Sequence, residues 1–105
     1  MIKDEKKKFD SSSNIIYVGD KPPMNYVTAI MGLLNSGNFT EVILKARGNT
    51  ISRAVDVAEI THNRFLTNVE VKQIEIGTEA VTNEDGRKSN VSSIEICLVM
   101  KKTEK

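Results

Sequence analysis

The chain has 105 residues, which is enough for one domain with a modest hydrophobic core. Its 15 basic and 14 acidic residues nearly cancel, so the net charge of +1 does not by itself indicate a nucleic-acid ligand. A single cysteine, Cys97, excludes a disulfide within this sequence, and with no apolar run long enough to span a membrane we expect a soluble cytoplasmic protein.

Residues 1–13 are polar and include four lysines, a composition typical of a disordered basic arm. We interpret this arm as a solvated tail, with contact to a polyanion as the alternative. The apolar run 14–18 predicts a short strand. Two prolines after it suit an extended segment and then a first helical turn, and apolar residues at helical spacing predict a helix over 24–35.

A second strand is predicted over 40–46 and a second helix over 50–65. Gly48 permits a tight turn between them, and Asn49 or Thr50 is expected to cap the helix by accepting hydrogen bonds from its first amides. The residues expected on the inner face of this helix are apolar, namely Ile51, Ala54, Val55, Ala58 and Ile60.

The junction between this strand and this helix concentrates positive charge. Lys45, Arg47 and Arg53 lie there, and no acidic residue occurs between Glu41 and Asp56. A helix N-terminus also favours anions through its free amides and its dipole. The junction is therefore predicted to be either a phosphate-binding site or a solvated turn whose charges maintain solubility. It is not a Walker loop, because it has one glycine and no Gly-Lys-Ser/Thr sequence.

Residues 69–81 and 92–100 predict two long strands joined by a hairpin loop with an Asp-Gly turn. A shift in the apolar phase after Val71 predicts a β-bulge. Strands of about ten residues make a ribbon about 30 Å long, so we expect its tip to project from a domain of this size. The tip carries Arg87 and Lys88, and it either reaches a DNA groove or is an ordinary mobile loop.

The element order predicts an α/β (α+β) two-layer sandwich, β-α-β-α-β-β, with two helices on a four-stranded mixed sheet and a long projecting C-terminal β-hairpin. This domain is predicted over 14–101, followed by a frayed tail over 102–105. No Ser-His-Asp set, paired catalytic carboxylates or metal-ligand cluster indicates an enzyme, a metal or a cofactor, and His62 is interpreted as a surface histidine. A small enzyme stands only as the alternative from another class.

Five stretches in register resemble the Alba family of archaeal chromatin proteins. They are Lys21-Pro22-Pro23-Met24-Asn25-Tyr26-Val27, Lys45-Ala46-Arg47-Gly48, Ile51-Ser52-Arg53-Ala54-Val55-Asp56, Asn63-Arg64-Phe65-Leu66 and Glu84-Asp85-Gly86-Arg87. The likeness covers about residues 14–101. It implies a dimer, formed with itself or with a paralogue, that has the fold of the C-terminal domain of translation initiation factor three. It also implies binding to double-stranded DNA without sequence preference and to RNA, on the chromosome in the cytoplasm.

The resemblance further implies which residues meet the nucleic acid, from the loop before the first helix, the basic junction and the hairpin. These are Lys21, Lys45, Arg47, Asn49, Arg53, Arg87 and Lys88. The segment Asn63, Arg64 and Phe65 matches the one through which neighbouring dimers associate in the family. Two departures lower the positive charge, since Asp20 replaces a lysine that is acetylated in the family and Asn49 replaces a common arginine. RNA as the main ligand therefore stays open as an alternative.

Overall fold

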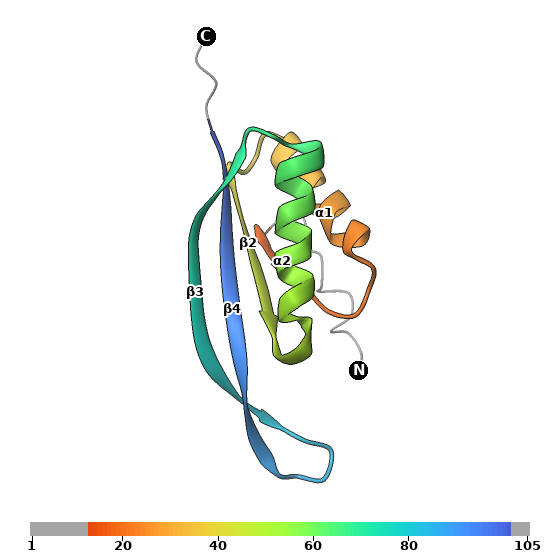
Figure 1. Ribbon diagram of the computed structural model, residues 1–105, viewed down its shortest axis with the longest axis vertical. Coiled ribbons are helices and arrows are strands. Elements are labelled where there is room, and N and C mark those ends of the chain that lie inside the picture. Colours follow the sequence, from red (N-terminus) through yellow and green to blue (C-terminus); the bar gives the residue numbers. More distant parts are fainter. Residues whose placement is uncertain (1–12, 102–105) are drawn as a thin grey trace.

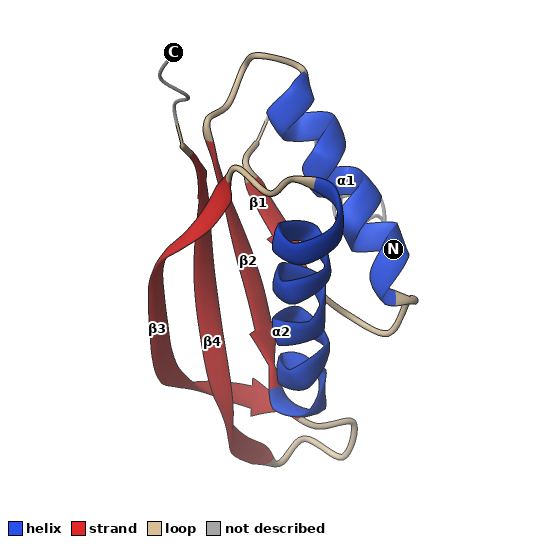
Figure 2. Cartoon of the chain, turned by 45° about the horizontal axis from the view of Figure 1, so that its top comes forward, coloured by secondary structure: helices blue, strands red, loops and turns tan. Residues whose placement is uncertain are grey.

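The computed structural model describes residues 13–101, in which two helices lie on one side of a four-stranded sheet (Figures 1 and 2). The elements in order are β1 (Ile15–Tyr17), α1 (Pro23–Asn35), β2 (Glu41–Arg47), a 3₁₀ turn (Gly48–Thr50), α2 (Ile51–Ile60), a π-helical turn (Thr61–Phe65), β3 (Val69–Thr82) and β4 (Lys88–Met100). The predicted α+β sandwich is confirmed. The predicted basic arm, apart from Ser13, and the predicted tail over 102–105 lie outside the described residues.

The sheet has the strand order β1-β2-β4-β3. β1 runs parallel to β2, because the helix α1 crosses over between them, whereas β4 is antiparallel to both β2 and β3. The predicted mixed sheet is therefore confirmed. The register of β3 against β4 shifts between Val71 and Gln73, which confirms the predicted bulge.

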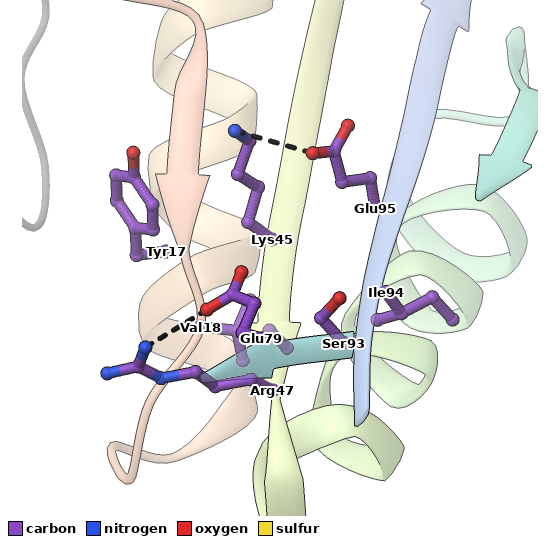
Figure 3. Close-up of a pocket in the computed structure, with 9 residues that line it drawn as sticks. Tyr17, Val18, Lys45, Arg47, Glu79, Ser93, Ile94 and Glu95 are labelled. Atoms are coloured by element: carbon purple, nitrogen blue, oxygen red, sulfur yellow. Dashed lines mark hydrogen bonds and ion pairs between the residues drawn. The ribbon is translucent and has the colours of Figure 1, made fainter. Parts of the chain in front are cut away.

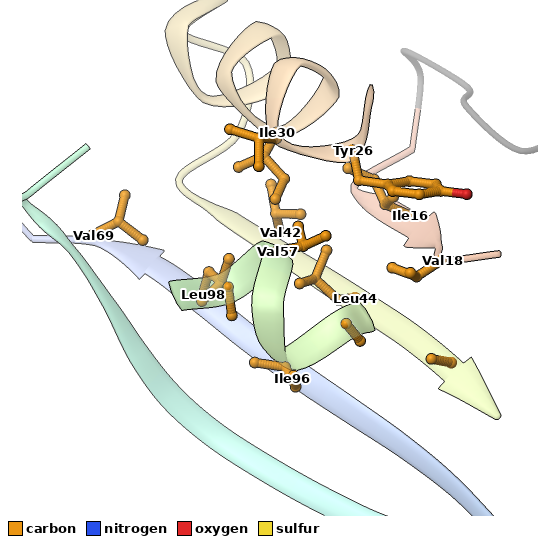
Figure 4. Packing of buried hydrophobic residues seen from close by; sticks show 14 of the residues in the cluster. Ile16, Val18, Tyr26, Ile30, Val42, Leu44, Val57, Val69, Ile96 and Leu98 are labelled. Atoms are coloured by element: carbon orange, nitrogen blue, oxygen red, sulfur yellow. The ribbon is translucent and has the colours of Figure 1, made fainter. Parts of the chain in front are cut away.

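The hydrophobic core lies between the helices and one face of the sheet (Figure 4). Alternate residues of the central strands enter it, such as Leu44 of β2 and Ile96 of β4, because side chains alternate across a strand. In α2 the buried positions are Ala54, Val57, Ala58 and the following Thr61, at the spacing of one helical face. The prediction that Val55 faces inward is wrong, since its side chain is 43% exposed. Neither helix of residues 13–101 is long and apolar enough to cross a membrane.

The hairpin of β3 and β4 projects beyond the body, as predicted. β2 ends at Arg47, opposite Ser93 of β4, whereas β3 and β4 continue to pair as far as Thr82 and Lys88. The two strands have 14 and 13 residues, longer than predicted, and Figure 1 shows their ribbon continuing past the end of β2. The loop closes with Gly86 at φ 87°, where a glycine avoids strain.

Candidate nucleic-acid interface

The sheet face opposite the helices, here called the open face, gathers charged side chains near the end of β2. Lys45 and Arg47 point to it because the residues between and before them, Ala46 and Leu44, are buried on the helix side. Figure 3 shows each cation beside a carboxylate. Arg47 Nη1 lies 3.0 Å from Glu79 Oε1, and Lys45 Nζ lies 3.4 Å from Glu95 Oε2. The structure thus brings the two predicted contacts together, each in an ion pair.

These ion pairs hold the cations in place without burying them. The side chains of Arg47 and Glu79 are each at least half exposed, and Lys45 and Glu95 are partly exposed. Exposed pairs of this kind contribute about 0.2–1 kcal/mol, because water solvates the separated charges almost as well. A phosphate oxygen can therefore replace a carboxylate as the partner of either cation at small cost.

The turn after β2 presents Arg47 through a local hydrogen-bond ring. Thr50 Oγ1 accepts from the Arg47 amide at 3.3 Å and donates to the Arg47 carbonyl at 2.8 Å. Thr50 occupies the predicted N-cap position of α2, but the prediction that the side chain accepts from the first helix amides is wrong, because the Thr50 hydroxyl bonds Arg47 instead. The predicted tight turn at Gly48 is confirmed by its φ of 61°, and Asn49 lies exposed beside it.

The loop before α1 is braced from two sides. The Tyr26 hydroxyl accepts from the Gly19 amide at 2.9 Å and from the Lys21 amide at 3.2 Å. Arg53 Nη1 of α2 donates to the Lys21 carbonyl at 3.0 Å. Arg53 is half-buried and supports this loop through that hydrogen bond, while Lys21 is exposed.

The hairpin tip presents the remaining predicted cations away from the junction. Arg87 is largely exposed, with its Nε 3.7 Å from Asp85 Oδ2, and its amide donates to Asp85 Oδ1 at 3.0 Å. Lys88 is the exposed first residue of β4. Ser93, the partner of Arg47, lies five positions further along β4, so tip and junction lie about 17 Å apart along the ribbon. One chain does not bring them together.

The segment that follows α2 lies at the other end of that helix from the junction. Phe65 and Arg64 are exposed there, and Asn63 Nδ2 donates to Glu59 Oε1 at 2.8 Å. His62, which was interpreted as a surface histidine, is half-buried, and its Nδ1 bonds the Val69 carbonyl at 2.5 Å. Among the described residues, no group of three or more His, Cys, Asp or Glu side chains could hold a metal ion.

The far end of the open face carries a third ion pair that the sequence did not indicate. Lys72 Nζ lies 2.9 Å from Glu41 Oε2, and the Cys97 thiol lies 3.7 Å from Glu41 Oε1. The hydrogen bond and charge of Lys72 lower the pKa of Glu41, and Glu41 in turn raises the pKa of Lys72. Burial, and then the negative charge of Glu41, raise the pKa of the Cys97 thiol. Cys97 is therefore a protonated thiol near neutral pH.

The chain is similar to known proteins over most of its length. The family model described as Alba matches residues 14–78. The chain belongs to the Alba family. The DNA/RNA-binding protein Alba of Methanococcus maripaludis is 54% identical over 85 residues, which cover 81% of this chain and 96% of that protein. The DNA/RNA-binding protein Alba 1 of Archaeoglobus fulgidus is 56% identical over 90 residues, covering 86% and 99%.

The solved structures agree with this assignment. Alba from Thermoplasma volcanium superposes with a TM-score of 0.76 at 52% identity, over 82% of this chain and 99% of that one. The Alba resemblance and the α+β fold inferred from the sequence are thus confirmed. The names of these two relatives describe nucleic-acid binding and no reaction. The individual contact residues stay predictions, because none of these comparisons tests a residue.

The sequence did not indicate the carboxylates that pair with the basic junction on the open face. Glu79 and Glu95 lie on strands far along the chain from Lys45 and Arg47, so only the fold brings them together. Tyr17 was also missed, although its neighbours Ile16 and Val18 are buried and it therefore faces outward. β1 is apolar or aromatic at every position, so its sequence carries no alternation that would indicate which side chain faces outward.

Proposed function

We propose that this chain is a non-sequence-specific double-stranded DNA-binding protein of the chromosome in the cytoplasm, which coats and compacts DNA as a dimer and also binds RNA. The observation that carries the proposal is the exposed Arg47, held beside Lys45 at the end of β2 by the Thr50 turn. The names of the Alba relatives, which describe DNA and RNA binding, support the same reading. Phosphate contacts of this kind give affinity without reading sequence.

Dimerisation is argued from an apolar strip on β3, made by Val71, Ile74 and Ile76. Their partners on β4 are Leu98, Ile96 and Ile94, which are buried beneath the helices. Directly paired residues share a face, so the strip continues the core side of the sheet beyond the cover of the helices. Ile76 is 82% exposed, an unusual state for such a side chain on a lone strand edge. A second copy of the chain covers this strip in the proposed dimer.

A dimer doubles the set of cations and presents two hairpin arms to one duplex. Lys21, Lys45, Arg47 and Asn49 on the body and Arg87 and Lys88 on the arm then contact the phosphate backbone, with Arg53 holding the Lys21 loop. Six to ten phosphate contacts reduce affinity by about 10³ to 10⁵ between 50 and 200 mM salt. A protein with a near-neutral net charge can therefore bind DNA strongly at low salt. Exposed Phe65, with Asn63 and Arg64, is the proposed contact between neighbouring dimers.

RNA as the principal ligand is the second candidate function. Lys45, Arg47 and Arg87 each lie beside a carboxylate, so the surface attracts a duplex backbone less than its count of cations indicates. Asp20 lowers the charge of the exposed loop further. A direct competition between a DNA duplex and a structured RNA distinguishes the two candidates.

The proposal is tested by the salt dependence of binding with Arg47→Gln. Fluorescence anisotropy of a random-sequence duplex, measured at several salt concentrations, gives the slope of log affinity against log salt. A dimer loses two phosphate contacts with this substitution, so the slope should fall by about 2. The matched control is Lys72→Gln, since Lys72 is also an open-face cation paired with a glutamate but lies at the far end of the face. Its slope should equal that of the unmodified protein.

Three results of this measurement would contradict or change the proposal. If the unmodified protein binds neither the duplex nor a structured RNA in a salt-dependent way, the proposed function is wrong. If it binds both and Arg47→Gln behaves like Lys72→Gln, the binding site is not at the junction. Stronger binding to RNA at every salt concentration would favour the second candidate.

A further inference from the structure

The open face carries a hollow of about 450 Å³ between the Lys45–Glu95 and Arg47–Glu79 ion pairs (Figure 3). Its walls include Tyr17, Lys45, Arg47, Glu79, Ser93 and Glu95, which come from all four strands. Sites for small ligands commonly measure about 300–1,000 Å³, so the hollow has room for a group of nucleotide size. It faces away from the apolar strip of β3, and the proposed dimer leaves it open.

Tyr17 gives this hollow an aromatic wall. It is 52% exposed, although both of its neighbours in the chain, Ile16 and Val18, are buried. Tyr17 is the register partner of Lys45, so the ring stands next to a cation on the adjacent strand. An exposed ring on a sheet, flanked by cations, is the arrangement on which unpaired bases stack.

The charges of the hollow suit an unpaired nucleotide as well as a duplex backbone. Lys45 and Arg47 suit a phosphate, but Glu79 and Glu95 repel one, so the hollow as a whole is close to neutral. The outer surface of a duplex presents negatively charged phosphate oxygens, which cannot donate a hydrogen bond to a carboxylate. An unpaired base presents ring and exocyclic N–H donors on its free edge, which a carboxylate accepts. Both signs of charge in the hollow thus find partners on one unpaired nucleotide.

We propose that this hollow binds one unpaired nucleotide of a single-stranded nucleic acid, with the base on the Tyr17 ring, the phosphate on Arg47 and the base edge on Glu95. The inference rests on the proposed nucleic-acid binding and adds a second mode to it. The cations exchange their glutamate partners for the ligand, which costs little because the pairs are exposed. All the residues belong to one chain, so the site does not depend on the dimer.

The test replaces the ring and compares single-stranded with double-stranded ligands. The probe is a labelled, non-self-complementary RNA of about 12 nucleotides, used alone and annealed to its complement. Tyr17→Leu should weaken binding of the single strand about fivefold to one-hundredfold, the range expected for loss of one stacked base, and leave duplex affinity unchanged. Tyr17→Phe keeps the ring and should bind as the unmodified protein does.

Three other results would contradict the inference, and they distinguish failure of the stacking site from failure of the proposed function. Unchanged single-strand affinity in Tyr17→Leu, with intact duplex binding, would remove the stacking site and leave the proposed function standing. An equal loss on both ligands, or an equal loss in Tyr17→Phe, would show that Tyr17 does not act by stacking an unpaired base. If the unmodified protein bound neither form of the RNA nor a DNA duplex, the proposed function itself would fail.

Discussion

The two faces of the sheet are formed by the same strands but differ in their surroundings, since one is buried beneath the helices and the other is open. In β2, Leu44 is buried beneath the helices while its neighbour Lys45 lies on the open face, and in β4 Ile96 and Glu95 have the same relation. The alternation of side chains along a strand puts a core residue and a surface residue side by side in the sequence. Under the proposed function, stability and nucleic-acid binding depend on different residues of one strand, and single substitutions should separate them.

The contributions of side chains to the free energy of folding also differ between the two faces. Burying a leucine or isoleucine side chain contributes about 1.5–3 kcal/mol. The ion pairs of Lys45 and Arg47 on the open face contribute about 0.2–1 kcal/mol each, because both partners remain in contact with water. The open face is thus free to change partners without loss of the fold.

The largest effect is expected from Ile96→Ala compared with Glu95→Ala. Ile96 is 2% exposed, and its truncation should lower the free energy of unfolding by about 2–5 kcal/mol through lost burial and a cavity. Glu95→Ala removes only an exposed ion pair and should cost less than about 1 kcal/mol. Urea unfolding at one fixed protein concentration measures both, since a dimer's stability depends on concentration. Equal losses would contradict the division between the two faces.

A second prediction concerns Ile76, which lies on the core side of the sheet but outside the cover of the helices. Ile76→Asp places a carboxylate in the proposed dimer contact, where its desolvation is uncompensated. Association should weaken at least about 100-fold, equivalent to about 2.7 kcal/mol, while the isolated chain keeps its fold. Sedimentation velocity over a range of concentrations measures this.

The control for that substitution introduces the same charge on the other side of β3. Gln73 pairs with Cys97 and lies on the open face, so Gln73→Asp should leave association unchanged. Dimers in both variants would show that the apolar strip is not the contact. Monomers in both would show that β3 tolerates no added charge, and the two faces would then not be distinguished.

The sequence predicted the features that depend on neighbouring residues. The strands over 40–46 and 92–100, the bulge after Val71 and the turn at Gly48 were predicted from local patterns, and the structure confirms each. The inner face of α2 was predicted with two errors, since Val55 was included and the buried Val57 was left out. Both residues are apolar, and only packing decides which is buried. The family likeness then supplied the candidate contacts.

What could not be predicted depends on residues that meet only in the fold. Glu79 reaches Arg47 from β3, and nothing near Arg47 in the sequence indicates that a carboxylate lies beside it. The Thr50 hydroxyl could bond either the amides of the following helix or the backbone of Arg47. In the 3₁₀ turn it bonds Arg47. The charge of the junction was therefore overestimated from the sequence, since its acids are distant along the chain.

The smallest expected effect concerns Cys97, which lies on the open face yet is only partly in contact with water. Burial and the carboxylate of Glu41 raise the pKa of its thiol, so at a given pH a smaller fraction is the reactive thiolate. Iodoacetamide should therefore alkylate folded Cys97 severalfold more slowly than the urea-unfolded chain at pH 8, with the rate still rising where an ordinary thiol has levelled off. Glu41→Gln removes the negative neighbour and should lower this pKa and speed the reaction. If the folded and unfolded chains reacted alike, water would reach this part of the open face as freely as it reaches Arg47, and the open face would be uniformly solvated along its length.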